Sequence, residues 1–252
     1  MPFLGGRGRQ SLPADWRVIT AASVAHWSVL DGTEQADLGR LMTALVSEIR
    51  WEAAQGFALT DTIRTVIAAQ ASLLILGLDF ACYGQVESII VHPTTMDFAR
   101  PLPGPVAGTM TVGPNPLLGQ ATHRGPVVIA WDAARAAARH PERGQDVVLH
   151  DFAHHLDMLD GLIDGTPPLR DPSTRNRWVQ VCTHELQLLR AGPGGGLLRD
   201  YAATNPGEFF AVATEVFFNR PVDLEITKPA LYEALRDFYR QDPAARARRS
   251  AR

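Results

Sequence analysis

His150 and His154 are the residues of this chain best suited to chemistry. They lie four positions apart in segment 147–154, which is otherwise mostly apolar and helical in character. Four residues make about one helical turn, so both imidazoles leave the same face of the predicted helix. Two neutral imidazoles on one turn are half of a typical zinc site. The pair therefore predicts a metal centre, and the next question is which residues complete it.

Asp151 stands where the His-Glu-x-x-His motif of metallopeptidases has its general base. The carboxylate is retained, but its reach is shorter by one C–C bond, ~1.5 Å, whereas a general base must lie within ~2.6–3.2 Å of its proton or act through one water. A misplacement of that size costs on the order of 100-fold in rate. Three outcomes stay open: the helix lies closer to the metal and compensates, activity is weak, or the chain binds metal without useful peptidase activity.

The third ligand must come from a separate element, because catalytic zinc sites use three protein ligands and keep one position for water. The best candidate is Glu208, at the start of a second buried helix predicted over 206–218, with Asn205 as its N-cap. Asn205 and Glu208 also have the spacing of a capping box, in which the carboxylate bonds back to the cap amide. Ligation and capping are therefore competing interpretations of Glu208.

Three further residues are candidates for supporting roles. Glu215 lies seven positions after Glu208, on the same helix face, and we expect it to accept a proton from a ligand histidine and fix its tautomer. Asp157 is a candidate for orienting a ligand or for hydrogen bonding at a helix end. Tyr201, just before the second helix, is either a packed aromatic or a catalytic donor.

The chain resembles the Mlc titration factor A family of bacterial zinc metallopeptidases. The resemblance extends over roughly residues 30–245 and is specific only when its segments are taken together. The segments that carry it most clearly are 150–157, 160–161, 165–168 and 201–212, with weaker similarity at 89–93, 125–131 and 238–243.

The resemblance implies a zincin-like fold in which His150, His154 and Glu208 hold zinc. It implies that the residue after the first histidine, a Glu in the family and Asp151 here, polarises the attacking water, and that Tyr201 donates a hydrogen bond to the oxyanion. It also implies a peptide substrate, aminopeptidase-type action on short peptides, and contact with a transcriptional regulator.

The elements that must position these residues predict an α+β fold, which is mostly helical with a small central sheet and two metal-bearing helices. Residues 1–15 are expected to be disordered, 16–245 to form one domain, and 246–252 to be a basic, solvated tail. Segment 93–126 is dense in Pro and Gly and reads as a long irregular connection with short strands near 108–112. The other predicted helices are 33–51, 61–76, 174–189 and 228–240, and the predicted strands are 86–92 and 127–131.

Composition narrows the function classes. The net charge of −3 gives no general attraction to nucleic acid or anionic membrane. The N-terminus lacks the apolar core of a signal peptide, and the longest apolar stretch, 66–78, is shorter than the ~20 residues of a membrane span. We therefore expect a cytoplasmic protein.

The sequence thus predicts a zinc-dependent peptidase that acts through a zinc-activated water. The alternative is a regulatory zinc-binding protein that binds a transcriptional regulator with little catalysis, which Asp151 favours. A structural zinc protein is a third reading and requires a fourth protein ligand in place of water.

Overall fold

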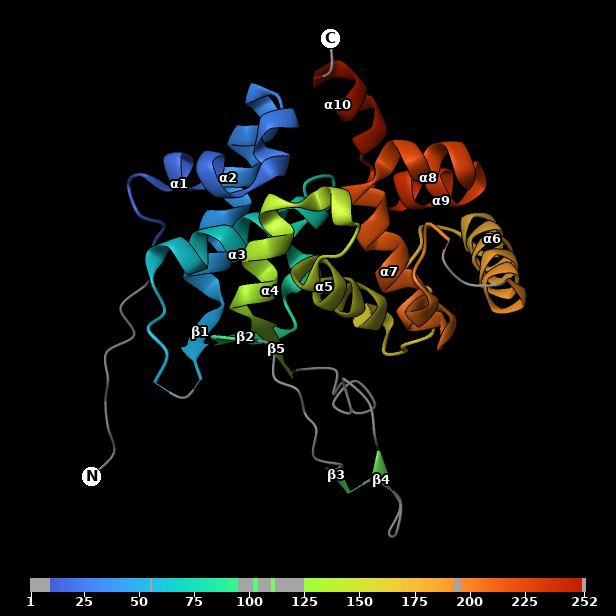
Figure 1. The fold of residues 1–252 in the computed structure, drawn as a ribbon, viewed down its shortest axis with the longest axis horizontal. Coiled ribbons are helices and arrows are strands. Elements are labelled where there is room, and N and C mark those ends of the chain that lie inside the picture. The colour runs from blue at the N-terminus through green and yellow to red at the C-terminus, as the bar shows by residue number, and fades with distance from the viewer. Residues whose placement is uncertain are drawn as a thin grey trace.

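Helices make up most of the molecule. They are α1 (Trp16–Ser23), α2 (Gly32–Glu48), α3 (Asp61–Leu74), α4 (Trp131–Arg139), α5 (Val147–Asp157), α6 (Pro172–Ala191), α7 (Pro206–Asn219), α8 (Pro221–Thr227), α9 (Pro229–Tyr239) and α10 (Pro243–Ser250), and the 3-10 turn η6 covers Asp200–Ala203. The strands are β1 (Arg50–Ala53), β2 (Val86–His92), β3 (Leu102–Pro103), β4 (Met110–Thr111) and β5 (Gly125–Ala130). A small parallel sheet lies beside α3, α4 and α5 (Figure 1). The computed structural model describes residues 10–54, 56–94, 102–103, 110–111, 125–192 and 196–250. The prediction of a mostly helical chain with a small sheet is confirmed. None of the helices in these ranges combines the length and apolar composition that crossing a bilayer requires.

The sheet has three parallel strands in the order β1-β2-β5. Trp51 of β1 is in register with Ile89 of β2, which in turn faces Val127 of β5. The predicted strand 86–92 matches β2. The prediction of a helix through Trp51 was wrong at its end, because α2 stops at Glu48 and the chain extends to pair with β2. That pairing joins residues far apart in sequence, so no local sequence pattern predicts it.

Two other boundaries differ from the predictions for identifiable reasons. The predicted strand 127–131 begins two residues earlier, and Trp131 starts helix α4, which the sequence analysis missed. The helix predicted over 61–76 begins where expected but ends two residues earlier, and its N-cap is Thr60, whose Oγ1 accepts from the Ile63 amide at 3.3 Å. Asp61 is the first residue of the helix, where its negative charge favours the helix dipole.

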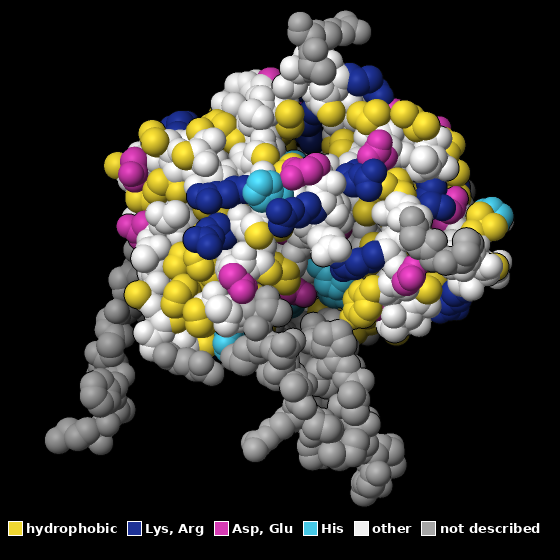
Figure 2. Space-filling view, viewed as in Figure 1, with side chains coloured by type: hydrophobic (Ala, Val, Ile, Leu, Met, Phe, Trp, Pro, Cys, Tyr) yellow, Lys and Arg dark blue, Asp and Glu magenta, His cyan; other side chains and the backbone are white. Residues whose placement is uncertain are grey.

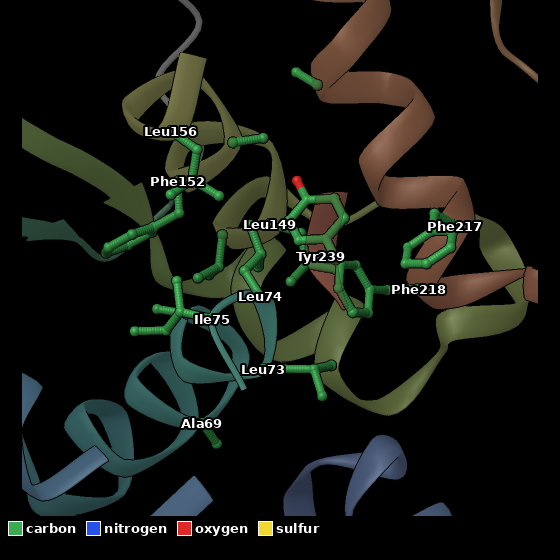
Figure 3. Packing of buried hydrophobic residues seen from close by; sticks show 14 of the residues in the cluster. Ala69, Leu73, Leu74, Ile75, Leu149, Phe152, Leu156, Phe217, Phe218 and Tyr239 are labelled. Carbon is green, nitrogen blue, oxygen red and sulfur yellow. The ribbon is translucent and has the colours of Figure 1, made fainter. Parts of the chain in front are cut away.

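Helices α5 and α7 pack side by side in the middle of the molecule, with α3 against α5. Figure 3 shows Leu149, Phe152 and Leu156 of α5 near side chains from the end of α3, with Phe217 and Phe218 of α7 beside Tyr239. Each of these side chains is buried. The Tyr239 hydroxyl is hydrogen-bonded to Thr214 of α7 at 2.8 Å. The two helices expected to carry the metal ligands are therefore embedded in the main core.

The C-terminal segment differs from the prediction of a solvated tail beginning at 246. Residues up to Ser250 form helix α10, and the Arg246 side chain is buried. Its guanidinium donates to Glu34 at 2.7 Å and to Gln241 at 2.8 Å, which compensates the buried charge. Residues 251–252 lie outside the described ranges.

The long connection 93–126 and residues 1–9 also lie mostly or wholly outside the described residues. Within the connection, β3 pairs antiparallel with β4, which falls inside the predicted region of short strands. Residues 10–15 are described and lead into α1, and Leu12 packs against the core.

Candidate metal centre

Helix α5 presents the two histidines toward α7. Its N-cap is Asp146, whose Oδ1 accepts from the amides of Val148 at 2.9 Å and Leu149 at 3.1 Å. The apolar residues of α5 face the core, and the imidazoles of His150 and His154 are both buried. Asp146 was missed by the sequence analysis, although an Asp directly before an apolar helical run is a typical N-cap signal.

Helix α7 brings Glu208 to the same place. Asn205 caps the helix as predicted, with its Oδ1 accepting from the Glu208 amide at 2.9 Å, and Pro206 is the first helical residue. The reciprocal bond of a capping box, from the Asn205 amide to the Glu208 carboxylate, is not formed. The Glu208 side chain turns to the histidines instead, so the capping-box interpretation of this carboxylate was wrong.

The three side chains converge on one point, and their donor atoms all lie within 4.8 Å of one another. Nε2 of His150 is 3.3 Å from Nε2 of His154, and Oε2 of Glu208 is 3.1 Å from the first nitrogen and 3.5 Å from the second. Two ligands bonded to zinc at ~2.0–2.1 Å in a tetrahedral arrangement stand roughly 3.3–3.4 Å apart. The spacing and donor types therefore fit a zinc ion.

The surroundings of the Glu208 carboxylate also suit a bound cation. Oε2 of Glu208 is buried and has no hydrogen-bond partner of acceptable geometry among the described residues. In the metal-free protein the charge of this buried oxygen is met by Nε2 of His150 at 3.1 Å and Nε2 of His154 at 3.5 Å, and a cation held between these atoms would replace that pairing.

Glu215 contacts His150 at Nδ1, the ring nitrogen that does not face Glu208, and it lies on the same face of α7 as Glu208, as the spacing predicted. Its Oε1 lies 2.7 Å from Nδ1 of His150, and its Oε2 accepts from the Asp146 amide at 2.7 Å. The Glu215 side chain is only 1% exposed. A carboxylate at this nitrogen fixes the tautomer, because the proton on Nδ1 leaves the Nε2 lone pair available to a metal.

Arg199 is a residue of the centre that the sequence analysis missed. Its guanidinium donates to both oxygens of Glu215, at 2.6 and 3.0 Å. It lies two residues before Tyr201 in a segment with no distinctive pattern, so no local signal pointed to it. The contact depends on how the segment before η6 folds over α7.

His154 has less support than His150. Its Nδ1 is buried and has no hydrogen-bond partner among the described residues, and the same is true of Oδ1 of Asp157 one turn later. The other oxygen of Asp157 accepts from the Gly165 amide at 2.9 Å. The structure thus shows Asp157 in the helix-end role, while the role of orienting a ligand stays a prediction.

Tyr201 and Asp151 lie near the cluster. The Tyr201 ring centroid is 6.1 Å from that of His150. Burial and the Glu208 carboxylate raise the pKa of Tyr201 well above its ordinary value, so its hydroxyl keeps its proton at neutral pH. In the metal-free protein, burial raises the pKa of Asp151 to about 7, although the charge of His150 opposes the shift.

In the metal-free cluster, a proton on His150 takes the place that a metal ion would occupy in balancing the carboxylates. Burial alone would lower the pKa of His150, but the Glu208 and Glu215 carboxylates outweigh burial and raise it to about 10. Burial acts to raise the pKa of Glu208, yet its two histidine neighbours lower it well below the ordinary range. A proton on His150 thus balances the carboxylates, and binding of a metal would release it.

Two histidines one turn apart, joined by a glutamate from a second helix, form the donor set of a metallopeptidase of the His-x-x-x-His class. Histidine side chains are visible in a recess of the face shown in Figure 2, beside a Lys or Arg side chain. The cluster contains three donors within the described residues, which is the number that catalytic zinc sites use.

Comparison with known proteins agrees with this class. Residues 6–240 match the glucose-regulated metallo-peptidase M90 family. An uncharacterized protein of Synechocystis, slr2042, is 30% identical over 239 residues, which cover 93% of this chain and 86% of that protein. The Mlc titration factor A proteins of Yersinia pestis and Yersinia pseudotuberculosis are 29% identical over 244 residues, covering 94% of this chain and 87% of theirs.

The chain therefore belongs to the glucose-regulated metallo-peptidase M90 family. The resemblance to Mlc titration factor A that the sequence suggested is confirmed over most of the chain.

Proposed function

We propose that this protein is a zinc-dependent peptidase with a zincin-like fold, in which His150, His154 and Glu208 hold the metal. The observation that carries the proposal is the convergence of two imidazole nitrogens and one carboxylate oxygen, 3.1–3.5 Å apart, from two separate helices. Family membership supports a peptidase, and the donor set is one that suits zinc.

The residues around the ligands fit the steps of peptide hydrolysis. When bound, zinc supplies Lewis-acid polarisation of a peptide carbonyl and lowers the pKa of a water molecule to about 7. Asp151 takes the proton of the attacking water and later delivers it to the leaving amine. Tyr201 donates a hydrogen bond to the carbonyl oxygen as negative charge develops there. The raised pKa of its hydroxyl suits a donor that must stay protonated.

Asp151 is the feature that limits the rate. Its side chain is one methylene shorter than that of Glu. We propose weak but real activity, on short peptides and of aminopeptidase type, in a cytoplasmic protein.

Substitution of Asp151 tests the catalytic assignment. We expect Asp151→Glu to raise hydrolysis of a panel of short peptide amides by on the order of 100-fold, and Asp151→Ala to abolish it, with zinc content unchanged in both. Zinc content is measured by metal analysis, and activity is measured after chelation and after readdition of zinc. Unaltered activity in Asp151→Ala would remove this residue from the mechanism.

A second candidate function is binding of a transcriptional regulator with little catalysis. The name Mlc titration factor A, borne by the Yersinia relatives, favours it, as does Asp151. The two functions separate in one experiment, because a regulatory protein keeps its zinc and its partner while hydrolysing none of the panel. Asp151→Glu would then create activity where the natural chain has none.

A further inference from the structure

The contact between Arg199 and Glu215 lies at the centre, and the proposed function gives it no role. The guanidinium is placed bidentately, with one nitrogen 2.6 Å from Oε1 and another 3.0 Å from Oε2. The Arg199 side chain is 31% exposed, whereas that of Glu215 is 1% exposed. A partly exposed cation therefore reaches inward to a carboxylate that water hardly touches.

Glu215 needs this cation because its other partners do not carry a fixed positive charge. They are the backbone amide of Asp146 and Nδ1 of His150. An imidazole must be neutral to bind a metal through its second nitrogen, so His150 stops balancing Glu215 once an ion is held. Among the described residues, Arg199 is the one Arg or Lys side chain paired with Glu215. A buried carboxylate left without it would be strongly disfavoured.

Arg199 also contacts the segment that carries Tyr201. It directly precedes η6, and its guanidinium carbon lies 5.6 Å from the centre of the Tyr201 ring, within the range of a cation–π contact. The same side chain therefore joins Tyr201 to the Glu215–His150 pair. No other described arginine makes both contacts.

We propose that Arg199 is a positioning residue of the metal centre. It holds ionised Glu215 against His150, so that this imidazole keeps the tautomer that ligates, and it fixes the Tyr201 ring over the same pair. This inference rests on the proposed function for the presence of a divalent metal and adds to it a residue that touches neither the ion nor the scissile bond.

Zinc affinity is the first test, measured by competition with a chromogenic chelator on the full chain. Loss of a partner of a ligand histidine typically weakens metal binding by ~10–100-fold, and we expect this for Arg199→Gln. Arg199→Lys restores the charge without the bidentate fork and should recover part of the affinity. The matched control is Arg177→Gln, because Arg177 also pairs with two carboxylates, Glu233 and Asp237, but on α6 and α9.

A double-mutant cycle with Glu215→Gln separates positioning from a general loss of stability. If Arg199 acts through Glu215, the double variant binds zinc about as weakly as Glu215→Gln alone, because the two losses are not additive. The absorption bands of the cobalt-substituted protein should change in Arg199→Gln and stay unchanged in Arg177→Gln. At saturating zinc, displacement of Tyr201 should lower kcat with little change in KM.

The outcomes separate this proposal from the proposed function. Wild-type protein that binds no divalent ion overturns both. Wild-type protein that binds zinc, together with Arg199→Gln of equal affinity and an unchanged cobalt spectrum, overturns the positioning role alone. If Arg199→Gln does not fold, Arg199→Lys decides, because a cation that merely stabilises the fold would leave its zinc affinity at the wild-type value.

Discussion

The two histidines of α5 lie one turn apart, yet their surroundings differ. Nδ1 of His150 meets Glu215, which is itself held by Arg199 and by the Asp146 amide. Nδ1 of His154 has no hydrogen-bond partner in the part of the chain that the structure describes, although Asp157 lies one turn away. A series of charged contacts therefore fixes the orientation of the His150 ring, whereas the described residues provide no such contacts at Nδ1 of His154.

That difference teaches which contacts define the centre. On the His150 side, Glu215 of α7 contacts the ring and is itself bonded by the Asp146 amide at the start of α5 and by Arg199 before η6. On the His154 side, Asp157 is engaged with the loop that follows α5, through the Gly165 amide. We expect the first side to govern metal affinity through electrostatics and the second to govern it through loop placement.

Glu208 belongs to both sides, so its replacement should have the largest effect. We expect Glu208→Gln to weaken zinc binding by more than about 100-fold, beyond the range typical for partners that do not touch the metal. Chelator competition measures it. The cap of α7 uses only the backbone amide of residue 208, so the helix content of the variant should match wild type. Affinity within about tenfold of wild type would remove Glu208 from the ligand set.

The pH dependence of zinc binding should reveal the proton held on the His150 side. The pKa of His150 is raised to about 10 in the metal-free protein, so this ring is charged at pH 7 and must lose a proton to bind metal. Affinity should therefore rise with pH, about tenfold per unit, and level off only as pH approaches 10. Calorimetry at pH 6–8, in buffers of different ionisation enthalpy, should show about one proton released per ion. A flat affinity between pH 7 and 8 would contradict this.

A paired substitution sharpens the comparison of the two sides. Glu215→Gln should weaken zinc binding by ~10–100-fold. Asp157→Asn keeps an oxygen for the Gly165 amide and should cost less than about threefold, because the structure shows no bond from Asp157 to His154. Both affinities come from the same chelator titration. Equal losses would mean that Asp157 bonds His154 once the ion is held.

Gly165 tests the loop on the His154 side through the stability of the fold and not through zinc affinity. Its φ is +73°, and a Cβ there would stand 2.3 Å from the carbonyl oxygen of Pro206, at the start of α7. We expect Gly165→Ala to lower the free energy of unfolding by about 1–3 kcal/mol, measured by urea denaturation. Gly56→Ala is the matched control, since Gly56 has the same φ but open space around it. If the two variants lose equal stability, the contact with Pro206 contributes nothing.

Much of the centre could be predicted because its residues repeat at helical spacing. One turn separates His150 from His154, and two turns separate Glu208 from Glu215, so periodicity alone placed each pair on one face. Their convergence across two helices was beyond local pattern and came from the family resemblance. Asn205 was found because a cap is a local signal.

The missed parts depend on contacts between distant residues. Arg199 reaches Glu215 only after the segment before η6 folds over α7, and β1 forms only by pairing with β2. Arg246 looked like part of a solvated tail, yet its partner Glu34 lies 212 positions earlier. Gly77, just after α3, lacks a Cβ and so passes close to the carbonyl oxygen of Tyr239, another contact between residues far apart in sequence.

The three donor atoms already stand at the separations of a filled tetrahedral site. Capture of an ion then requires little rearrangement of the three donor side chains. The speed of loading should be set by how fast the incoming ion sheds its water and the His150 proton departs. Rapid-mixing measurements should accordingly give an uptake rate that changes with acidity and hardly at all with solvent viscosity.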